Sequence, residues 1–134
     1  MIICIDASAA VQFALNPEEF SRIGSVIVEA NYVVTPHLYI YECTNTIWKY
    51  VQFVKASPKL GYELLNNLKA IPDEFIFSDD AHELILRIAI DHSISAYDSA
   101  YLQVALWGGA ILLSLDKKLI SAAEALDVEV MQIT

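Results

Sequence analysis

The stretch that decides the fold is Ile2-Ile3-Cys4-Ile5-Asp6-Ala7-Ser8, at the start of the chain. Four consecutive apolar residues are typical of a short strand that is buried on both faces of a parallel sheet. Asp6 ends this run, and residues 7–15 have the pattern of a helix. A carboxylate at the end of a buried strand is unfavourable unless it is hydrogen-bonded, paired or bound to a metal ion. Asp6 therefore indicates either a helix cap or a functional site.

Short apolar runs and helical segments alternate along the rest of the chain. Strands are expected at residues 2–5, 32–35, 75–77 and 110–115, and a fifth at 128–131 is left open. Helices are expected at residues 7–15, 18–30, 38–56, 58–70, 79–92, 96–107 and 117–126, with Ser57, Ser78 or Asp79, and Ser95 as caps. This order predicts an α/β fold, a three-layer α/β/α sandwich with a central parallel sheet of four to five strands. Residues 1–134 contain no linker or repeat and are expected to form a single domain.

Composition narrows the class of protein. The formal net charge is −9 with only eight Lys and Arg residues, which argues against a broad basic face for nucleic acid. An acidic protein can still bind phosphate through metal ions, because a cation reverses the sign of the local field. No apolar run reaches the ~18 residues that span a bilayer, so a cytoplasmic protein without a membrane partner is expected. Cys4 and Cys43 have no metal-ligand spacing and are expected to be buried, inert thiols.

Three further acids occupy positions comparable to that of Asp6. Asp116 ends the apolar run 110–115, and Glu42 and Asp98 lie inside helical patterns that are otherwise apolar and aromatic. Each acid has an ordinary structural explanation. Asp6 and Asp116 fit helix N-caps, Asp98 fits a capping box with Ser95, and Glu42 fits a solvated helix face.

The combination of the four acids favours a metal site. The carboxyl ends of parallel strands share one edge of the sheet, where ligands of open α/β folds bind. Carboxylates gathered there repel one another and raise their pKa values, and a divalent cation removes that cost. Hard oxygen ligands suit Mg²⁺ or Mn²⁺, and a water bound to such an ion can attack a phosphodiester.

Four blocks of the sequence resemble, in order, those of the PIN-domain family. They are Ile3-Cys4-Ile5-Asp6-Ala7-Ser8-Ala9; Thr35-Pro36 followed by Glu42 and Asn45; Tyr97-Asp98-Ser99-Ala100-Tyr101-Leu102; and Leu112-Leu113-Ser114-Leu115-Asp116-Lys117-Lys118-Leu119. The subgroup that the chain resembles most is that of the VapC-type toxins. The resemblance implies Mg²⁺- or Mn²⁺-dependent cleavage of RNA by a homodimer that a small antitoxin protein holds inactive.

The same resemblance implies roles for individual residues. Asp6, Glu42, Asp98 and Asp116 would form an acidic catalytic quartet, with Asp6 and Asp98 as the most direct metal ligands. Ser8, Asn45 and Ser114 match polar positions that support the site. The alternative is a PIN-like scaffold that binds protein or RNA without catalysis. An aspartyl-phosphate phosphatase is disfavoured because Ser8 stands where that chemistry needs a second carboxylate, and the glycine-free first turn disfavours a nucleotide-binding fold.

Substrate and partner contacts are less well defined by the sequence. Arg22, Lys49 and the pair Lys117-Lys118 are the basic residues considered for phosphate contact, beside their ordinary role as solvated side chains. Tyr39, Trp48 and Phe53 crowd one long helix and are expected to expose an apolar patch for dimerisation or antitoxin docking.

Overall fold

A computed structural model describes residues 1–133, and its centre is a parallel sheet in the order β3-β2-β1-β4. The strands are β1 (Ile2–Ile5), β2 (Tyr32–Pro36), β3 (Glu74–Ile76) and β4 (Ile111–Leu113). β1 pairs in parallel with β2 on one side and with β4 on the other. The strand that opens the chain therefore lies in the interior of the sheet, as its unbroken apolar sequence predicts.

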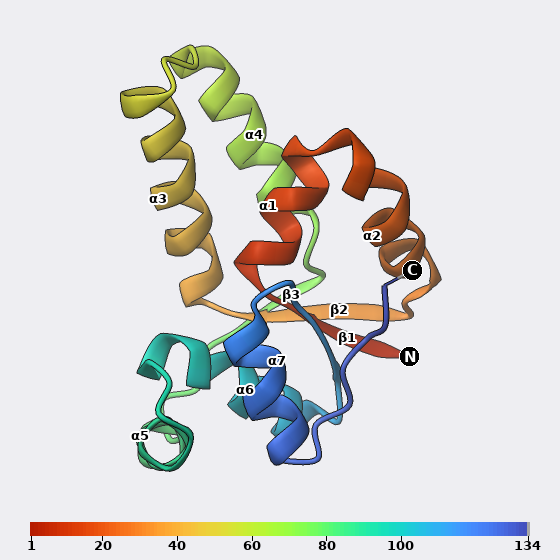
Figure 1. Cartoon of the computed structure of the whole chain (residues 1–134), viewed down its shortest axis with the longest axis vertical. Coiled ribbons are helices and arrows are strands. Elements are labelled where there is room, and N and C mark those ends of the chain that lie inside the picture. The colour runs from red at the N-terminus through yellow and green to blue at the C-terminus, as the bar shows by residue number, and fades with distance from the viewer. Residues whose placement is uncertain (134) are drawn as a thin grey trace.

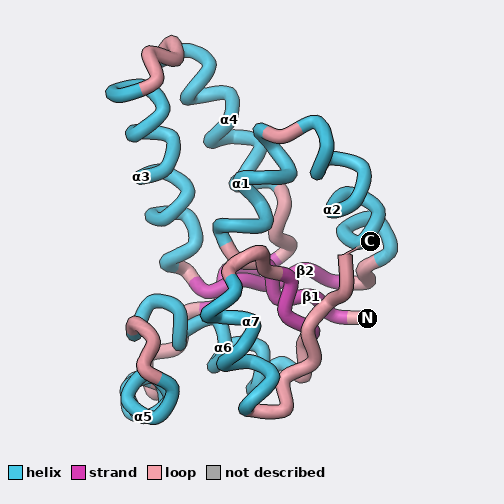
Figure 2. Tube along the Cα trace, viewed as in Figure 1, coloured by secondary structure: helices cyan, strands magenta, loops and turns pink. Residues whose placement is uncertain are grey.

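Helices cover both faces of the sheet (Figures 1 and 2). On one face lie α1 (Ala7–Leu15), α2 (Pro17–Glu29), α3 (Leu38–Phe53) and α4 (Pro58–Ala70), and α3 and α4 extend away from the sheet as a pair. On the other face lie α5 (His82–His92), α6 (Ala96–Gly108) and α7 (Lys117–Ala125). The predicted three-layer α/β/α sandwich is confirmed.

The strand order places a switch point beside Asp6. From β1 the chain crosses over α1 and α2 to β2 on one side, whereas β4, on the other side of β1, is reached through α5 and α6. The helices that follow β1 and β4, α1 and α7, therefore leave the carboxyl ends of these strands toward opposite faces of the sheet. In open α/β sheets this crevice is where ligands bind. Asp6 follows β1 directly, and its backbone N–H bonds the carbonyl of Leu113 at the end of β4 (3.1 Å).

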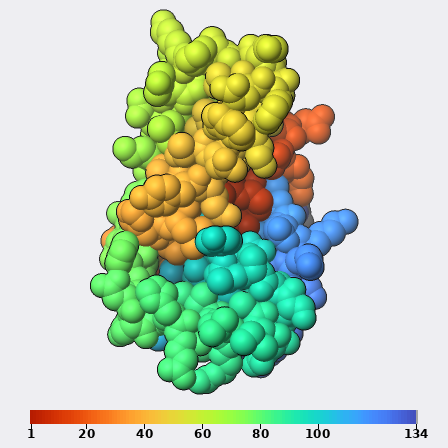
Figure 3. Space-filling view, turned by 90° about the vertical axis from the view of Figure 1, so that its left-hand side faces the viewer, coloured from red at the N-terminus to blue at the C-terminus, as the bar shows by residue number. Residues whose placement is uncertain are grey.

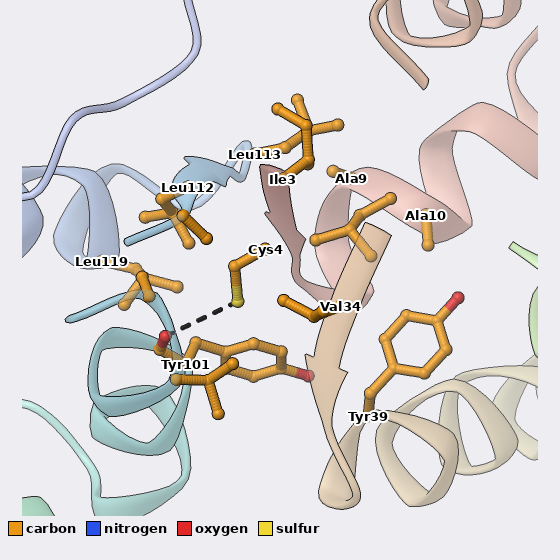
Figure 4. Close-up of a cluster of buried hydrophobic side chains, with 14 of the residues drawn as sticks. Ile3, Cys4, Ala9, Ala10, Val34, Tyr39, Tyr101, Leu112, Leu113 and Leu119 are labelled. Carbon is orange, nitrogen blue, oxygen red and sulfur yellow. Dashed lines mark hydrogen bonds between the residues drawn. The ribbon is translucent and has the colours of Figure 1, made fainter. Parts of the chain in front are cut away.

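Figure 4 shows the buried thiol of Cys4 beside Tyr101 of α6, and Tyr39 of α3 across β2 from them. Cys4 is fully buried, and its Sγ lies 3.6 Å from the carbonyl oxygen of Tyr101. Cys43 is also buried, and burial raises its pKa to about 12. Both cysteines are thus the inert thiols that the sequence predicts. Tyr39 is fully buried as well, and its hydroxyl donates to the carbonyl of Leu68 (2.8 Å), so its expected place in an exposed patch is wrong.

Several predicted boundaries differ from the structure. Ser78 and Asp79 do not cap α5; they belong to a separate turn, and the N-cap is Ala81, which offers no side-chain oxygen. Residues 128–131 form a single parallel bridge, Leu112 with Val130, rather than a fifth strand. α3 ends at Phe53 rather than near residue 56. Ser57 and Ser95 are caps as expected.

Among the helices of residues 1–133, none combines the length and the apolar character needed to cross a lipid bilayer.

Candidate active site at the carboxyl ends of β1 and β4

Asp6 is the buried centre of the candidate site, with 4% of its surface exposed. Its Oδ1 accepts a hydrogen bond from the backbone N–H of Ala9 (2.9 Å), so it caps α1 as the ordinary explanation requires. Its carboxylate also accepts from Ser8 Oγ (2.7 Å to Oδ1) and from Ser114 Oγ (2.5 Å to Oδ2). Burial nevertheless raises the pKa of Asp6, against the lowering effect of these bonds. A cap alone does not explain why this charge is placed inside the protein.

The two serines tie the end of β4 to Asp6. The backbone N–H of Leu115 donates to Ser8 Oγ (3.1 Å), and the N–H of Asp116 donates to Ser114 Oγ (3.0 Å). The loop after β4 is therefore fixed by the same hydroxyl groups that bond Asp6. Asp116 then caps α7, because its Oδ1 accepts from the N–H of Leu119 (3.0 Å). The structure thus places Ser8 and Ser114 as supports of the buried carboxylate.

Glu42 reaches the site from α3 on the other side of the crevice. It is half-buried, and its Oε1 accepts a hydrogen bond from the hydroxyl of Tyr101 on α6 (2.5 Å). Burial raises the pKa of Glu42, and the negative charges of Asp98, Asp6 and Asp116 raise it further, whereas the Tyr101 bond lowers it. Tyr101 was not among the predicted site residues. It lies three positions after Asp98 and so shares a face of α6 with it. This spacing in the sequence was the sign that Tyr101 could lie near the site.

Asp98 lies in the first turn of α6, where its backbone N–H donates to Ser95 Oγ (3.0 Å). Burial raises the pKa of Asp98, and the charge of Asp116 adds to this effect, while Ser95 and Lys118 lower it. The charge of Asp116 therefore raises the pKa of each of the other three acids. The structure brings all four predicted acids into one electrostatic neighbourhood. Figure 3 shows the start of the chain recessed between α3 and the segment near Asp116.

The side-chain oxygens fit a hydrated divalent cation better than a closed protein cage. Within residues 1–133, no three His, Cys, Asp or Glu side chains converge tightly enough to hold a metal ion by themselves. Mg²⁺ usually keeps several waters and is bound through one or two carboxylates, so such a closed cage is not required. Hard oxygen donors gathered around a buried carboxylate match the preference of Mg²⁺ and Mn²⁺. Within residues 1–133, Lys118 is the only basic side chain that lowers the pKa of Asp6, Glu42 or Asp98, and it acts on Asp98.

An open pocket of about 640 Å³ continues from the acids between α1 and α3. Ser8 and Gln12 of α1 line it on one side, and Glu42, Asn45 and Lys49 of α3 on the other. Asn45 is exposed and lies in this pocket, with no hydrogen bond to the acids within the described residues. The helix face that carries Glu42, for which the sequence allowed a solvated role, therefore lines this pocket together with Asn45 and Lys49.

The sequence matches the family model of the PIN domain over residues 3–125. Two relatives come from Pyrobaculum aerophilum. The protein named exonuclease VapC9 is 26% identical over 129 residues, covering 95% of this chain and 90% of the relative. The protein named ribonuclease VapC3 is 27% identical over 133 residues, covering 94% of this chain and 98% of the relative.

The fold is also found among solved structures. The crystal structure of PAE2754 from Pyrobaculum aerophilum superposes with a TM-score of 0.73 at 23% identity, covering 91% of this chain and 87% of that chain. The family model spans all four acids and both supporting serines. The resemblance noted in the sequence is thereby confirmed, and the chain belongs to the PIN domain family.

Proposed function

We propose that the protein is an Mg²⁺- or Mn²⁺-dependent endoribonuclease, and that Asp6, Glu42, Asp98 and Asp116 form its catalytic quartet. The observation that carries the proposal is the burial of Asp6 at the switch point of the sheet, beside Asp116 and Glu42, with Asp98 interacting with the same two acids. Such an arrangement costs free energy unless a cation is bound. The names of the relatives VapC9 and VapC3, an exonuclease and a ribonuclease, support nuclease chemistry.

The chain's own residues have distinct roles in this proposal. Asp6 and Asp98 would hold the cation, with Glu42 and Asp116 completing the site directly or through water. A bound Mg²⁺ or Mn²⁺ would supply charge stabilisation at the phosphoryl oxygens and make a water molecule more acidic. Ser8 and Ser114 fix the orientation of the Asp6 carboxylate, and Tyr101 fixes that of Glu42. These outer contacts keep the oxygens in place before substrate arrives.

Cleavage of single-stranded RNA tests the assignment. The wild-type protein should cut RNA with Mg²⁺ or Mn²⁺ and stop when a chelator is added. Asp6→Asn should abolish cleavage, whereas Asp91→Asn, the same change at an exposed acid of α5, should leave it intact. Full activity of Asp6→Asn, or equal activity in excess chelator, would contradict the proposal. Absence of cleavage by the wild-type protein, with RNA still bound, would favour the non-catalytic scaffold.

Whether the protein cuts within the RNA or from its ends needs its own test, because the name of the relative VapC9 describes an exonuclease. A circular RNA has no ends, so only an endonuclease can cut it. Linear products from the circle would support the proposal. An intact circle beside a degraded linear RNA of the same sequence would assign exonuclease activity instead.

We further propose that the protein is the cytoplasmic toxin of a type II toxin–antitoxin pair, acts as a homodimer and is inhibited by a small antitoxin. The names of the relatives VapC9 and VapC3 support this. Trp48 and Phe53 of α3 are exposed and pack edge to face (ring centroids 5.7 Å apart), which leaves aromatic surface for a partner. Light scattering should give a dimer mass, and expression alone should arrest growth unless a neighbouring small protein is co-expressed. A monomer mass would contradict the homodimer, and growth unaffected by expression would contradict the toxin role.

A further inference from the structure

The pocket between α1 and α3 has a composition that the acidic quartet does not explain. Beyond Glu42 its polar lining consists of neutral hydrogen-bonding side chains and one lysine, beside three apolar side chains. The neutral polar residues are Ser8, Gln12, Asn45 and Thr46, and the apolar ones are Ala7, Val11 and Leu115. Among the residues that the structure describes, Lys49 is the only basic one that lines it. Glu42 and Lys49 are seven residues apart on α3, which places Lys49 about 10 Å along the helix axis from Glu42. The pocket therefore runs from the carboxylates toward a positive charge.

Lys49 is exposed and forms neither an ion pair nor a hydrogen bond within residues 1–133. Within these residues the ion pairs are made by Arg22 and Arg87, so what distinguishes Lys49 from the other lysines is its place in the pocket. The acid nearest to it along α3 is Glu42, two turns away and bonded to Tyr101. The ammonium group of Lys49 is thus available to an anion in the pocket.

We propose, on the basis of the nuclease function proposed above, that this pocket is the subsite for the phosphodiester next to the scissile one, and that Lys49 binds that phosphate. The amide groups of Gln12 and Asn45 supply neutral hydrogen bonds to the same backbone or to a base. A pocket of about 640 Å³ has the size of a site for a small ligand, which is room for one or two nucleotides of an RNA strand. The RNA strand accordingly runs along the pocket between α1 and α3.

The salt dependence of cleavage tests the role of Lys49. A phosphate contact in single-stranded nucleic acid adds about 0.7 to the slope of log affinity against log salt. Lys49→Gln should make the slope of log kcat/KM against log salt shallower by about 0.7. This corresponds to a loss of about fivefold in kcat/KM at 0.1 M salt. Lys49→Arg should retain the slope. Lys59→Gln, at an exposed lysine of α4 outside the pocket, is the matched control and should behave as wild type.

Substitution of single phosphates identifies the contacted position. In a set of RNA oligonucleotides, each phosphate flanking the cleavage site is replaced in turn by an uncharged methylphosphonate. One flanking substitution should slow the wild-type protein about fivefold and should not slow Lys49→Gln further, because both changes remove the same contact. A salt slope for Lys49→Gln equal to that of Lys59→Gln, with active wild-type protein, would overturn the subsite and leave the nuclease proposal standing. Independent effects of the two changes at every position would overturn it as well. Wild-type protein that cuts no RNA would overturn both proposals.

Discussion

The hydroxyl of Tyr101 and the carboxylate of Glu42, 59 residues apart in sequence, are joined by a hydrogen bond of 2.5 Å. This bond connects α6 with α3, and those two helices lie on opposite faces of the sheet. Tyr101 is almost fully buried, and burial raises its pKa, so it remains a neutral donor at physiological pH. Glu42 therefore has a fixed orientation at the mouth of the crevice.

Removing that donor should affect the site more than the fold. Tyr101→Phe should cost about 1.5 kcal/mol of unfolding free energy. It should also reduce metal affinity and cleavage by about 10- to 100-fold, which is the usual effect of losing a group that orients a ligand. Tyr39→Phe is the matched control, since it removes an equally buried hydroxyl that bonds only the carbonyl of Leu68. It should cost about 1 kcal/mol and leave cleavage unchanged. Equal activity of the two variants would contradict the positioning role.

Ser114 gives a second test of how the site is held. Its hydroxyl donates to Asp6 and accepts from the N–H of Asp116, so Ser114→Ala should loosen both acids. Cleavage should fall about 10- to 100-fold, and Ser114→Thr, which keeps the hydroxyl, should restore most of it. Ser99→Ala removes a buried hydroxyl that bonds the carbonyl of Ile85 and serves as the control for stability. Kinetic assays beside chemical denaturation separate the two effects. Full activity of Ser114→Ala would exclude a role in the site.

The pH dependence of stability should be unusual in metal-free protein. Burial raises the pKa values of Asp6, Glu42 and Asp98 above their unfolded values of about 4. An acid whose pKa is higher in the folded protein than in the unfolded chain makes its full contribution to stability at a pH below its unfolded pKa. This contribution is lost as the pH rises through its pKa in the folded protein. The melting temperature in chelator should therefore fall as the pH rises from about 4, and less so in Asp6→Asn. Saturating Mg²⁺ should reverse the trend. The same slope in wild type and Asp6→Asn would contradict this explanation.

Two adjacent glycines at the end of α6 provide a test of the fold alone. Gly109 is the C-cap with φ of 58°, a left-handed conformation that side chains disfavour, whereas Gly108 is the last helical residue. No atom lies within 4 Å of a Cβ added at either position. Gly109→Ala should therefore destabilise the protein by about 1 kcal/mol. Gly108→Ala should stabilise it by about 0.5 kcal/mol. Thermal denaturation measures both, and equal shifts for the two variants would contradict the assigned cap.

The sequence predicted the features that follow from local pattern and from parallel-strand geometry. Asp6 and Asp116 were placed on one edge because each directly follows an apolar run, and the structure places both there. The serines were assigned through the family motif. Both donate hydrogen bonds to Asp6, and their support of a catalytic site stays a prediction.

Features that depend on how distant elements pack were not predictable in this way. The spacing of Asp98 and Tyr101 on α6 places both on one face, but it does not reveal that Tyr101 meets Glu42, since that contact depends on the sheet between the two helices. Tyr39 was expected at the surface because its helix also carries exposed aromatic side chains, but α4 covers it and Leu68 accepts its hydroxyl. The start of α5 was misplaced because Ser78 and Asp79 close a turn of their own before the helix.

Calorimetric titration of Mn²⁺ into metal-free protein tests the central claim most directly, namely that the four acids form one cation site. We expect saturable uptake by the wild-type protein, the same uptake by Asp91→Asn, and its loss in Asp6→Asn. No uptake by folded wild-type protein, or undiminished uptake by Asp6→Asn, would contradict the claim.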